Sequence, residues 1–209
     1  MRSPEEPTRS IEVERSYDVA GDTALPDWTL LDLVAHVGAG EVRELDARYF
    51  DTADLALARA RVAVRRRTGG PDAGWHVKSA AREGRHEWGW PLEADGDDHD
   101  RVPDVIRDAV ATWASAPLQQ IARIRNTRTA YALTDLEGGL VAEMVDDRVR
   151  AHSANGASAW REWEVELGSA APADPAWRAG FFAQVERLVA SVGGRVAASD
   201  SKLARALGR

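Results

Sequence analysis

Acidic side chains take alternate positions in two short segments near opposite ends of the chain. In residues 11–19 (IEVERSYDV), Glu12 and Glu14 follow this pattern, and Ser16 takes the next position on the same face. Residues 160–167 repeat it with Glu162, Glu164 and Glu166. Alternate side chains of a β-strand point to one face, so each segment predicts a strand with adjacent carboxylates on one face. Adjacent carboxylates repel each other unless their face is solvated or holds a cation, and the chemistry they suit is divalent-metal binding.

Basic side chains take alternate positions in the segments between these two. The bases on the predicted strand faces are Arg65, Arg67, Lys78, Arg85 and Arg128, with Lys202 near the C-terminus, and further acids are Glu87, Glu143 and Asp147. Arginine and lysine hold phosphate oxygens, and carboxylates hold Mg²⁺ or Mn²⁺, which also bridges phosphates. If these faces converge on one interior, a polyanion bound with divalent cations would satisfy both signs of charge.

A second interpretation of the alternation involves no ligand. Half-exposed antiparallel sheets are common, and on a solvated face the same residues would form cross-strand ion pairs that contribute little stability. From alternation alone, this two-layer β protein with one wet face is the favoured interpretation.

Composition excludes several functional classes. The chain has 209 residues, 44% of them hydrophobic, and a net charge of -7, which argues against a general nucleic-acid binder. It contains no cysteine, which excludes disulfides and thiolate metal sites. No apolar run approaches a membrane span, so we expect a cytoplasmic protein without a membrane partner. The sequence also lacks the HExxH, GxSxG, P-loop and GxGxxG motifs.

The periodicity of the chain predicts about eight strands, mostly in antiparallel style, and roughly four or five helices. We expect residues 1–10 to form a flexible tail and residues 11–209 a single domain. The predicted strands cover residues 11–19, 41–51, 60–68, 75–80, 85–92, 117–133, 140–152 and 160–167. The predicted helices cover residues 26–38, 54–58, 102–113, 174–192 and 199–207. Residues 95–100 are expected to form a solvated acidic loop.

Many of these segments resemble motifs of the CYTH superfamily, the triphosphate tunnel metalloenzymes, in the order of that family. The matching segments are EVE at 12–14 (from ExExK), YFDT at 49–52, VRRR at 64–67 (LRxR), WHVK at 75–78 (WxxK), RHE at 85–87 (RxE), NTR at 126–128 (TxR), Glu143 with Asp146 and Asp147, EVEL at 164–167, and SKL at 201–203. The resemblance runs from residue 11 to about residue 207.

The resemblance implies an α+β fold, an eight-stranded antiparallel β-barrel (the triphosphate tunnel) with flanking helices. It implies that Mg²⁺ or Mn²⁺ is bound by Glu12, Glu14, Glu164 and Glu166, with Glu143 and Asp147, or Asp146 in its place, nearby. It implies that a triphosphate is held by Arg65, Arg67, Lys78, Arg85, Arg128 and Lys202. Among these residues we expect catalysis to depend on Glu12, Glu14, Arg65, Lys78 and Lys202.

The function implied by the resemblance is metal-dependent hydrolysis of a small triphosphate: inorganic triphosphate, thiamine triphosphate or a nucleoside triphosphate. Two positions depart from the family pattern, because Ser16 stands where ExExK has lysine and Asn126 where the family often has lysine. Ser16 leaves open a module that binds polyphosphate or a nucleotide with little or no chemistry. A third alternative is an adenylate cyclase. We expect a monomer or a homodimer, without a nucleic-acid partner.

Overall fold

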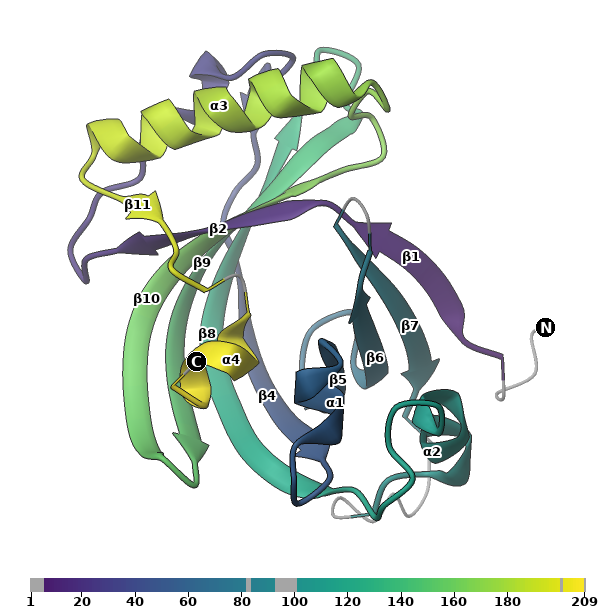
Figure 1. Cartoon of the computed structure of the whole chain (residues 1–209). Coiled ribbons are helices and arrows are strands. Elements are labelled where there is room, and N and C mark those ends of the chain that lie inside the picture. The colour runs from purple at the N-terminus through teal and green to yellow at the C-terminus, as the bar shows by residue number, and fades with distance from the viewer. Residues whose placement is uncertain (1–5, 82–83, 93–100, 200, 209) are drawn as a thin grey trace.

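One antiparallel sheet dominates the computed structural model, which describes residues 6–81, 84–92, 101–199 and 201–208 (Figure 1). Its strands are β1 (Thr8–Glu12), β2 (Glu14–Val19), β3 (His36–Val37), β4 (Glu41–Asp51), β5 (Val62–Thr68), β6 (Gly74–Ala80), β7 (Arg85–Pro91), β8 (Gln119–Thr134), β9 (Leu140–Ser153), β10 (Gly156–Leu167) and β11 (Arg195–Val196). The helices are the 3₁₀ turn η1 (Trp28–Leu30), α1 (Ala56–Arg59), α2 (Asp104–Val110), α3 (Pro175–Ser191) and α4 (Lys202–Ala206).

The N-terminal segment closes the sheet into a tunnel. The strand order is β1-β7-β6-β5-β4-β8-β9-β10-β2-β11. β1 lies at one end of the order and β2 next to the other end, although the two are consecutive in the chain. The chain leaves β7 at Glu12, passes through Val13 and joins β10 at Glu14. The carbonyl oxygen of Val13 accepts a hydrogen bond from the Leu167 amide at 2.9 Å. The expected antiparallel, barrel-like tunnel fold is therefore confirmed. The described part of the sheet has eleven strands and not the eight predicted, and β1 and β2 are linked by the chain at Val13 and not by strand pairing.

This closing segment differs from the predicted strand in two ways. It begins at Thr8, so residues 8–10, which we expected in the tail, are part of β1. It is also interrupted at Val13, because its two halves pair with different neighbouring strands. Side-chain periodicity gives no signal for a change of pairing partner.

The predicted helix over residues 26–38 is wrong. This stretch contains η1 and then β3, which pairs with β8. The buried side chains Trp28, Leu31 and Val34 are three residues apart, a spacing that a helix would also show. Leu33, between the last two, has a φ of 66°, which an α-helix does not allow. The three apolar side chains are thus buried, as their spacing suggested, but they pack against the sheet from η1 and the segment after it and not from an α-helix.

The other predicted elements are confirmed with small changes of bounds. β4 covers the residues predicted for it, and the helix predicted over 102–113 is the shorter α2. The two-residue strand β11 was not predicted. The acidic loop predicted over 95–100 lies outside the described residues. No helix in the described part of the chain has the length and apolar character needed to cross a membrane.

Apolar side chains cover the outer face of the sheet beneath α3. Phe181, Val185 and Val189 of α3 are fully buried and belong to the same cluster as Trp163 and Met144 of the strands. Figure 1 shows α3 lying across one end of the sheet. This leaves the inner faces of the same strands free to carry charged residues, because the hydrophobic driving force is supplied on the outside.

The turn between β6 and β7 gives a test of the closure. Gly84 has a φ of 81°, and a Cβ there would overlap the carbonyl oxygen of Glu12. We expect Gly84→Ala to lower the free energy of unfolding by at least about 1–2 kcal/mol, since both the left-handed backbone and the contact with β1 penalise a side chain. Urea unfolding measures this. Gly21→Ala, where nothing lies within 4 Å of the added Cβ, should be nearly neutral, and equal losses in the two variants would contradict the prediction.

Candidate functional site

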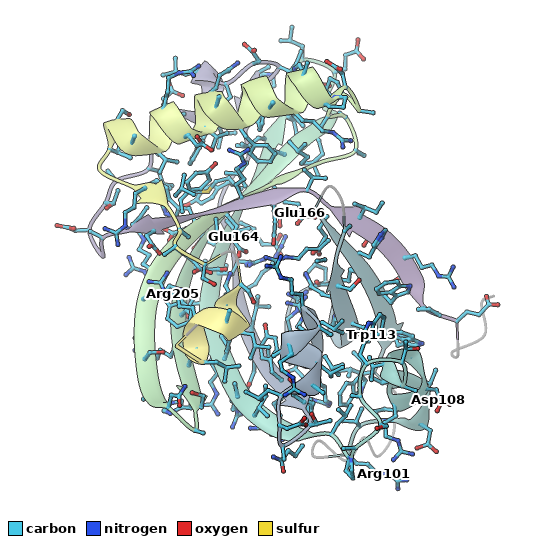
Figure 2. All side chains as sticks on the ribbon, viewed as in Figure 1. Arg101, Asp108, Trp113, Glu164, Glu166 and Arg205 are labelled. Atoms are coloured by element: carbon cyan, nitrogen blue, oxygen red, sulfur yellow. The ribbon has the colours of Figure 1, made fainter. Side chains whose placement is uncertain are left out.

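The curled sheet encloses a cavity of about 880 Å³. Its lining includes all but one of the residues predicted to bind metal or triphosphate: Glu12, Glu14, Arg65, Arg67, Lys78, Arg85, Arg128, Glu143, Glu164, Glu166 and Lys202. Asp147 is the exception, because it is fully buried beneath the lining. Figure 2 shows Glu164 and Glu166 inside the curl of the sheet. The structure thus brings the predicted acids and bases into one interior and does not leave them on a solvated face.

Three carboxylates form a row across β2, β10 and β9. Glu166 lies directly opposite Glu14 on one side and Glu143 on the other. Burial, together with the charge of Glu14, raises the pKa of Glu166 to about 7. Arg85 contacts Glu14 at 3.2 Å and Arg43 contacts Glu143 at 3.4 Å. Within the described residues no ion pair is recorded for Glu166, so the centre of this row is an acid that a bound cation would stabilise.

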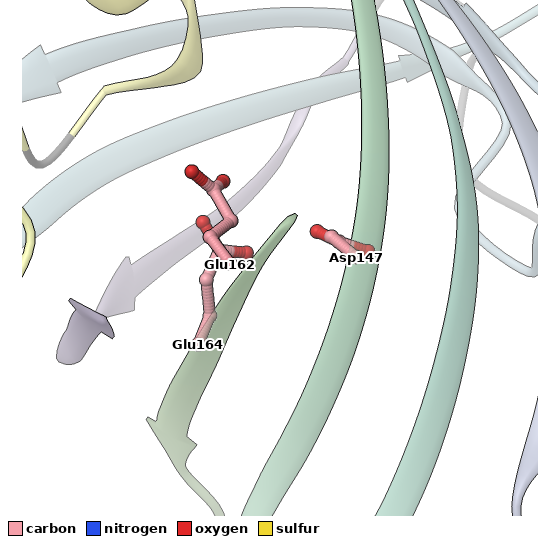
Figure 3. A group of neighbouring side chains, drawn as sticks. All are labelled: Asp147, Glu162 and Glu164. Atoms are coloured by element: carbon pink, nitrogen blue, oxygen red, sulfur yellow. The ribbon is translucent and has the colours of Figure 1, made fainter. Parts of the chain in front are cut away.

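A second acidic cluster is already paired with basic side chains of the protein. Ligand atoms of Asp147, Glu162 and Glu164 lie within 4.8 Å of one another, and Figure 3 shows these side chains on neighbouring strands. The Lys202 ammonium contacts them at 2.9, 2.5 and 2.6 Å. Arg128 places a two-pronged contact on Asp147 at 2.8 and 2.7 Å and reaches Glu164 at 2.8 Å. The cluster has the donor set of a metal site, and two basic side chains neutralise it.

The pKa values in this cluster reflect both burial and pairing. Burial alone would raise the pKa of Asp147, but Lys202 and Arg128 hold it well below its ordinary value. Burial raises the pKa of Glu162, against the opposing charge of Lys202. Burial would lower the pKa of Lys202, yet the charges of Asp147, Glu164 and Glu162 raise it well above the ordinary value.

Helix α4 places Lys202 in the tunnel. The Ser201 hydroxyl caps the helix by accepting a hydrogen bond from the Ala204 amide at 3.3 Å. Leu203 and Ala206 are buried against strand residues, and Ser153 of β9 donates a hydrogen bond to the Ala206 carbonyl at 2.8 Å. One face of a short helix is thereby packed on the sheet, which fixes the lysine at its first position.

A third group of charges lies on the opposite wall. The Lys78 ammonium contacts Glu12 at 2.6 Å and Glu87 at 3.6 Å, and Arg65 contacts Glu87 at 3.3 Å. Burial, with the adjacent Glu87, raises the pKa of Glu12 to about 8. Burial would also raise the pKa of Glu87, but hydrogen bonds from His76 and Glu12 and the charges of Lys78 and Arg65 hold it below its ordinary value. Glu12 and Glu87 thus anchor the basic wall.

His76 is buried on the same face of β6 as Lys78 and contacts Glu87 of this group, and we did not predict it as a site residue. Its Nδ1 lies 2.5 Å from Glu87 Oε1 and its Nε2 lies 3.0 Å from the carbonyl oxygen of Asp72. Burial, with the charges of Arg65 and Arg67, lowers the pKa of His76 to about 4 despite Glu87. Burial, with the charges of Arg65 and Arg128, lowers the pKa of Arg67 to about 9. The sequence signal was the position of His76, which shares a strand face with Lys78.

Two more residues of the interior were missed. Arg43 lines the cavity from β4, directly opposite Arg128. Glu162 was predicted on the face of Glu164 but was not proposed as a ligand. Alternation predicts which face of a strand a residue lies on, but it does not predict which residues on that face bind a ligand.

The structure resolves the choice between Asp146 and Asp147. Asp147 faces the interior, while Asp146 forms a two-pronged pair with Arg161 at 2.8 and 2.7 Å on the other face of the sheet. Ser16 is buried directly opposite Glu164 and is not among the residues lining the cavity. Arg15 points away from the tunnel, as alternation predicted, and pairs with Glu186 of α3.

An antiparallel sheet curled around a cavity that is lined by charges of both signs defines the triphosphate-tunnel fold. The CYTH domain model matches residues 10–189, so the chain belongs to the CYTH family. Two curated relatives, the uncharacterized proteins Rv2226 and MT2285 of Mycobacterium tuberculosis strains H37Rv and CDC 1551, are 37% identical over 216 residues, covering 97% of this chain. The chain spans 41% of the length of these relatives.

Solved structures share the fold. An adenylate cyclase candidate from Bacillus halodurans superposes with a TM-score of 0.64 at 20% identity, covering 94% of this chain and 97% of that one. HpAC1 from Hippeastrum, an adenylyl cyclase candidate described as having a dominant triphosphatase activity, superposes with a TM-score of 0.59 at 17% identity, covering 95% and 96%. At this identity, the likeness establishes the fold alone.

Lys202 gives a stability test of the site. We expect Lys202→Met to lower the free energy of unfolding at pH 7 by about 3–5 kcal/mol, because it leaves buried carboxylates with too few cations. The contribution of Asp147, whose pKa is lowered, is fully present above the ordinary pKa of aspartate, about 3.9, and is lost as the pH falls through the lowered value. The contribution of Lys202, whose pKa is raised, is present below about 10.4, its ordinary value.

The difference between wild type and variant should therefore be largest near neutral pH and should shrink in acid. Urea unfolding from about pH 3 to pH 8 measures it. Adding Glu162→Gln to Lys202→Met removes one unpaired acid and should recover part of the loss. A loss that does not change with pH, and that the second substitution does not relieve, would show that Lys202 contributes through packing alone.

Proposed function

We propose that the chain hydrolyses a small triphosphate in a metal-dependent reaction inside the tunnel. The observation that carries this proposal is that charges of both signs line one cavity: Arg65, Lys78 and Arg128 face the same interior as Glu14, Glu143 and Glu166. A cavity of about 880 Å³ is in the range of pockets that bury a whole small molecule. The family relationship and the described activity of HpAC1 support the same class of reaction.

The carboxylates present suit Mg²⁺ or Mn²⁺, which prefer oxygen ligands. Glu14, Glu143 and Glu166 would hold the ion, since Glu166 is a buried acid with a raised pKa at the centre of their row. Glu164, Asp147 and Glu12 form the adjoining acids, and each of them is contacted by a lysine. When bound, the ion would supply positive charge to the phosphate oxygens and a lowered pKa for water.

The chain's own basic residues would bind and orient the phosphates. Arg65, Arg67 and Arg128 present guanidinium groups that match phosphate oxygens, and Lys78, Arg85 and Lys202 add charge from the other sides of the cavity. Hydrolysis requires water oxygen to attack a terminal phosphorus, the P–O bond to the next phosphate to break, and the leaving phosphate to take a proton. Guanidinium groups fixed around that phosphate neutralise the charge that develops on its oxygens. We also expect a cytoplasmic monomer or homodimer acting without nucleic acid or membrane.

A phosphate-release screen tests the proposal. Inorganic, thiamine and nucleoside triphosphates should be assayed with Mg²⁺, with Mn²⁺ and with EDTA, and we expect turnover that EDTA stops. Glu14→Ala should lower kcat/KM by about 100-fold or more, because it removes a ligand from the row. Glu137→Ala, in the exposed hairpin after β8, is the matched control and should leave turnover unchanged. No release from any triphosphate, or equal turnover in both variants, would refute the proposal.

Ser16 favours a second candidate, a module that binds polyphosphate or a nucleotide with little or no chemistry. It occupies the lysine position of the ExExK motif, and it is buried opposite Glu164 without lining the cavity. A hydroxyl there supplies no positive charge. Calorimetry showing tight triphosphate binding with no phosphate release would support this candidate.

Restoring the lysine separates the two candidates. If the missing charge limits catalysis, Ser16→Lys should raise turnover by about tenfold or more, since a positioned cation stabilises charge in the transition state. Binding measured in parallel controls for misfolding of the substituted interior. A variant that binds triphosphate as the wild type does, with no gain in turnover, would rule out this explanation. Cyclic AMP formed from ATP in the same assays would instead indicate an adenylate cyclase.

A further inference from the structure

We propose that a groove outside the tunnel is a second anion site, which binds phosphoryl groups. The groove has a volume of about 630 Å³. Its lining carries one acid, Asp18, and five arginines: Arg148, Arg150, Arg161, Arg195 and Arg205. We call it the arginine groove. It shares no lining residue with the tunnel cavity, so the inference is independent of the function proposed above.

Positive charge is concentrated on this part of the sheet. The strand register places Arg148 directly opposite Arg161, and Arg150 directly opposite Arg125. Like charges at such positions destabilise a sheet. The chain as a whole has a net charge of -7, so the excess of arginine is local. Arg161 is paired with Asp146 and Arg125 with Asp46. An anion in the groove would therefore chiefly neutralise Arg148 and Arg150, for which no ion pair is recorded within the described residues.

Several of the arginines have donors that the protein does not use. Within the described residues, Arg150 has no recorded hydrogen bond or ion pair, and Arg148 donates only one hydrogen bond, to the Gly21 carbonyl at 3.4 Å. Arg195 is 81% exposed and contacts Asp18 at 3.5 Å. These three guanidinium groups come from β9 and β11 and are available to a ligand.

The other two arginines fix the walls of the groove. Arg161 directs two nitrogens at Asp146 and a third at the carbonyl oxygens of Ala20 and Thr23, at 3.0 and 2.8 Å. This holds the segment after β2 against the sheet. Arg205 of α4, labelled in Figure 2, pairs with Asp18 and lies over the Trp160 ring, 4.7 Å from its centroid. The charges around the groove are therefore held in place before any ligand binds.

The arrangement favours phosphoryl groups over carboxylates. A carboxylate is planar, and its two oxygens match the two parallel donors of one guanidinium fork. A phosphoryl group is tetrahedral and offers three strong acceptor oxygens that point in different directions. The unused donors come from two strands, Arg148 and Arg150 from β9 and Arg195 from β11, and all three residues line the same groove. Donors from more than one direction suit an ion with acceptors on several sides.

Calorimetric titration with inorganic triphosphate in EDTA tests the assignment. We expect two binding events in the wild type, one in the tunnel and one in the groove. Arg148→Glu with Arg150→Glu should weaken one event by about tenfold or more and leave the other unchanged. Arg101→Glu with Arg187→Glu is the matched control, because it makes the same change of charge at exposed sites elsewhere and should retain both events. If the tunnel does not bind triphosphate, the wild type should show a single event, which the groove variant removes.

Three further measurements complete the test. Thermal unfolding of both double variants checks the fold, and Arg150→Gln serves as a milder substitution that should still weaken the groove event. Amide chemical shifts around Arg148 and Arg150 should move when triphosphate is added. Poly-glutamate at the same ionic strength tests the carboxylate alternative. The proposal fails if the groove variant binds triphosphate as the control does, or if poly-glutamate perturbs these amides and triphosphate does not.

Discussion

The pairing of buried charges is the constraint on which the rest of this structure depends. Lys202 lies among three carboxylates, and the burial of any one of them without a cation would cost several kcal/mol. The interior is stable only if each buried acid lies next to a basic side chain. Strand register provides this on the sheet, where Arg128 lies opposite Asp147. Helix α4 provides it for Lys202, which is distant in sequence from its partners.

The closing segment divides the charges between the two walls. Glu12 and Glu14 are two residues apart, and on an unbroken strand their side chains would point the same way. The change of pairing partner at Val13 places Glu12 beside β7, where it binds Lys78, and Glu14 beside β10, where it enters the carboxylate row. The EVE segment therefore contributes one acid to the basic wall and one to the acidic row.

Local patterns predicted most of the sheet because each strand carries its own alternation. They predicted the interior residues for the same reason, since a face is a property of one strand. The choice between Asp146 and Asp147 was open because it depends on which face is enclosed. The segment with Trp28, Leu31 and Val34 was predicted as a helix because its spacing fits two structures. The left-handed backbone of Leu33, which excludes the helix, leaves no signal in the apolar spacing. His76 was missed because its role depends on Glu87, which lies on another strand.

The existing ion pairs also determine what kind of ligand the tunnel can accept. A phosphate chain that recruits Lys78 takes it from Glu12, and one that recruits Lys202 takes it from Glu162 and Glu164. Release of Lys202 would leave the ionised Glu164 with one cation fewer, which offsets the gain from the new contact. Glu12, whose pKa is raised to about 8, can instead take up a proton when Lys78 leaves. If the ligand binds together with divalent cations, these cations can bind the carboxylates that the lysine has left, and so replace its positive charge. Under the function proposed above, the charges of the interior would therefore favour triphosphate bound together with divalent cations over triphosphate alone.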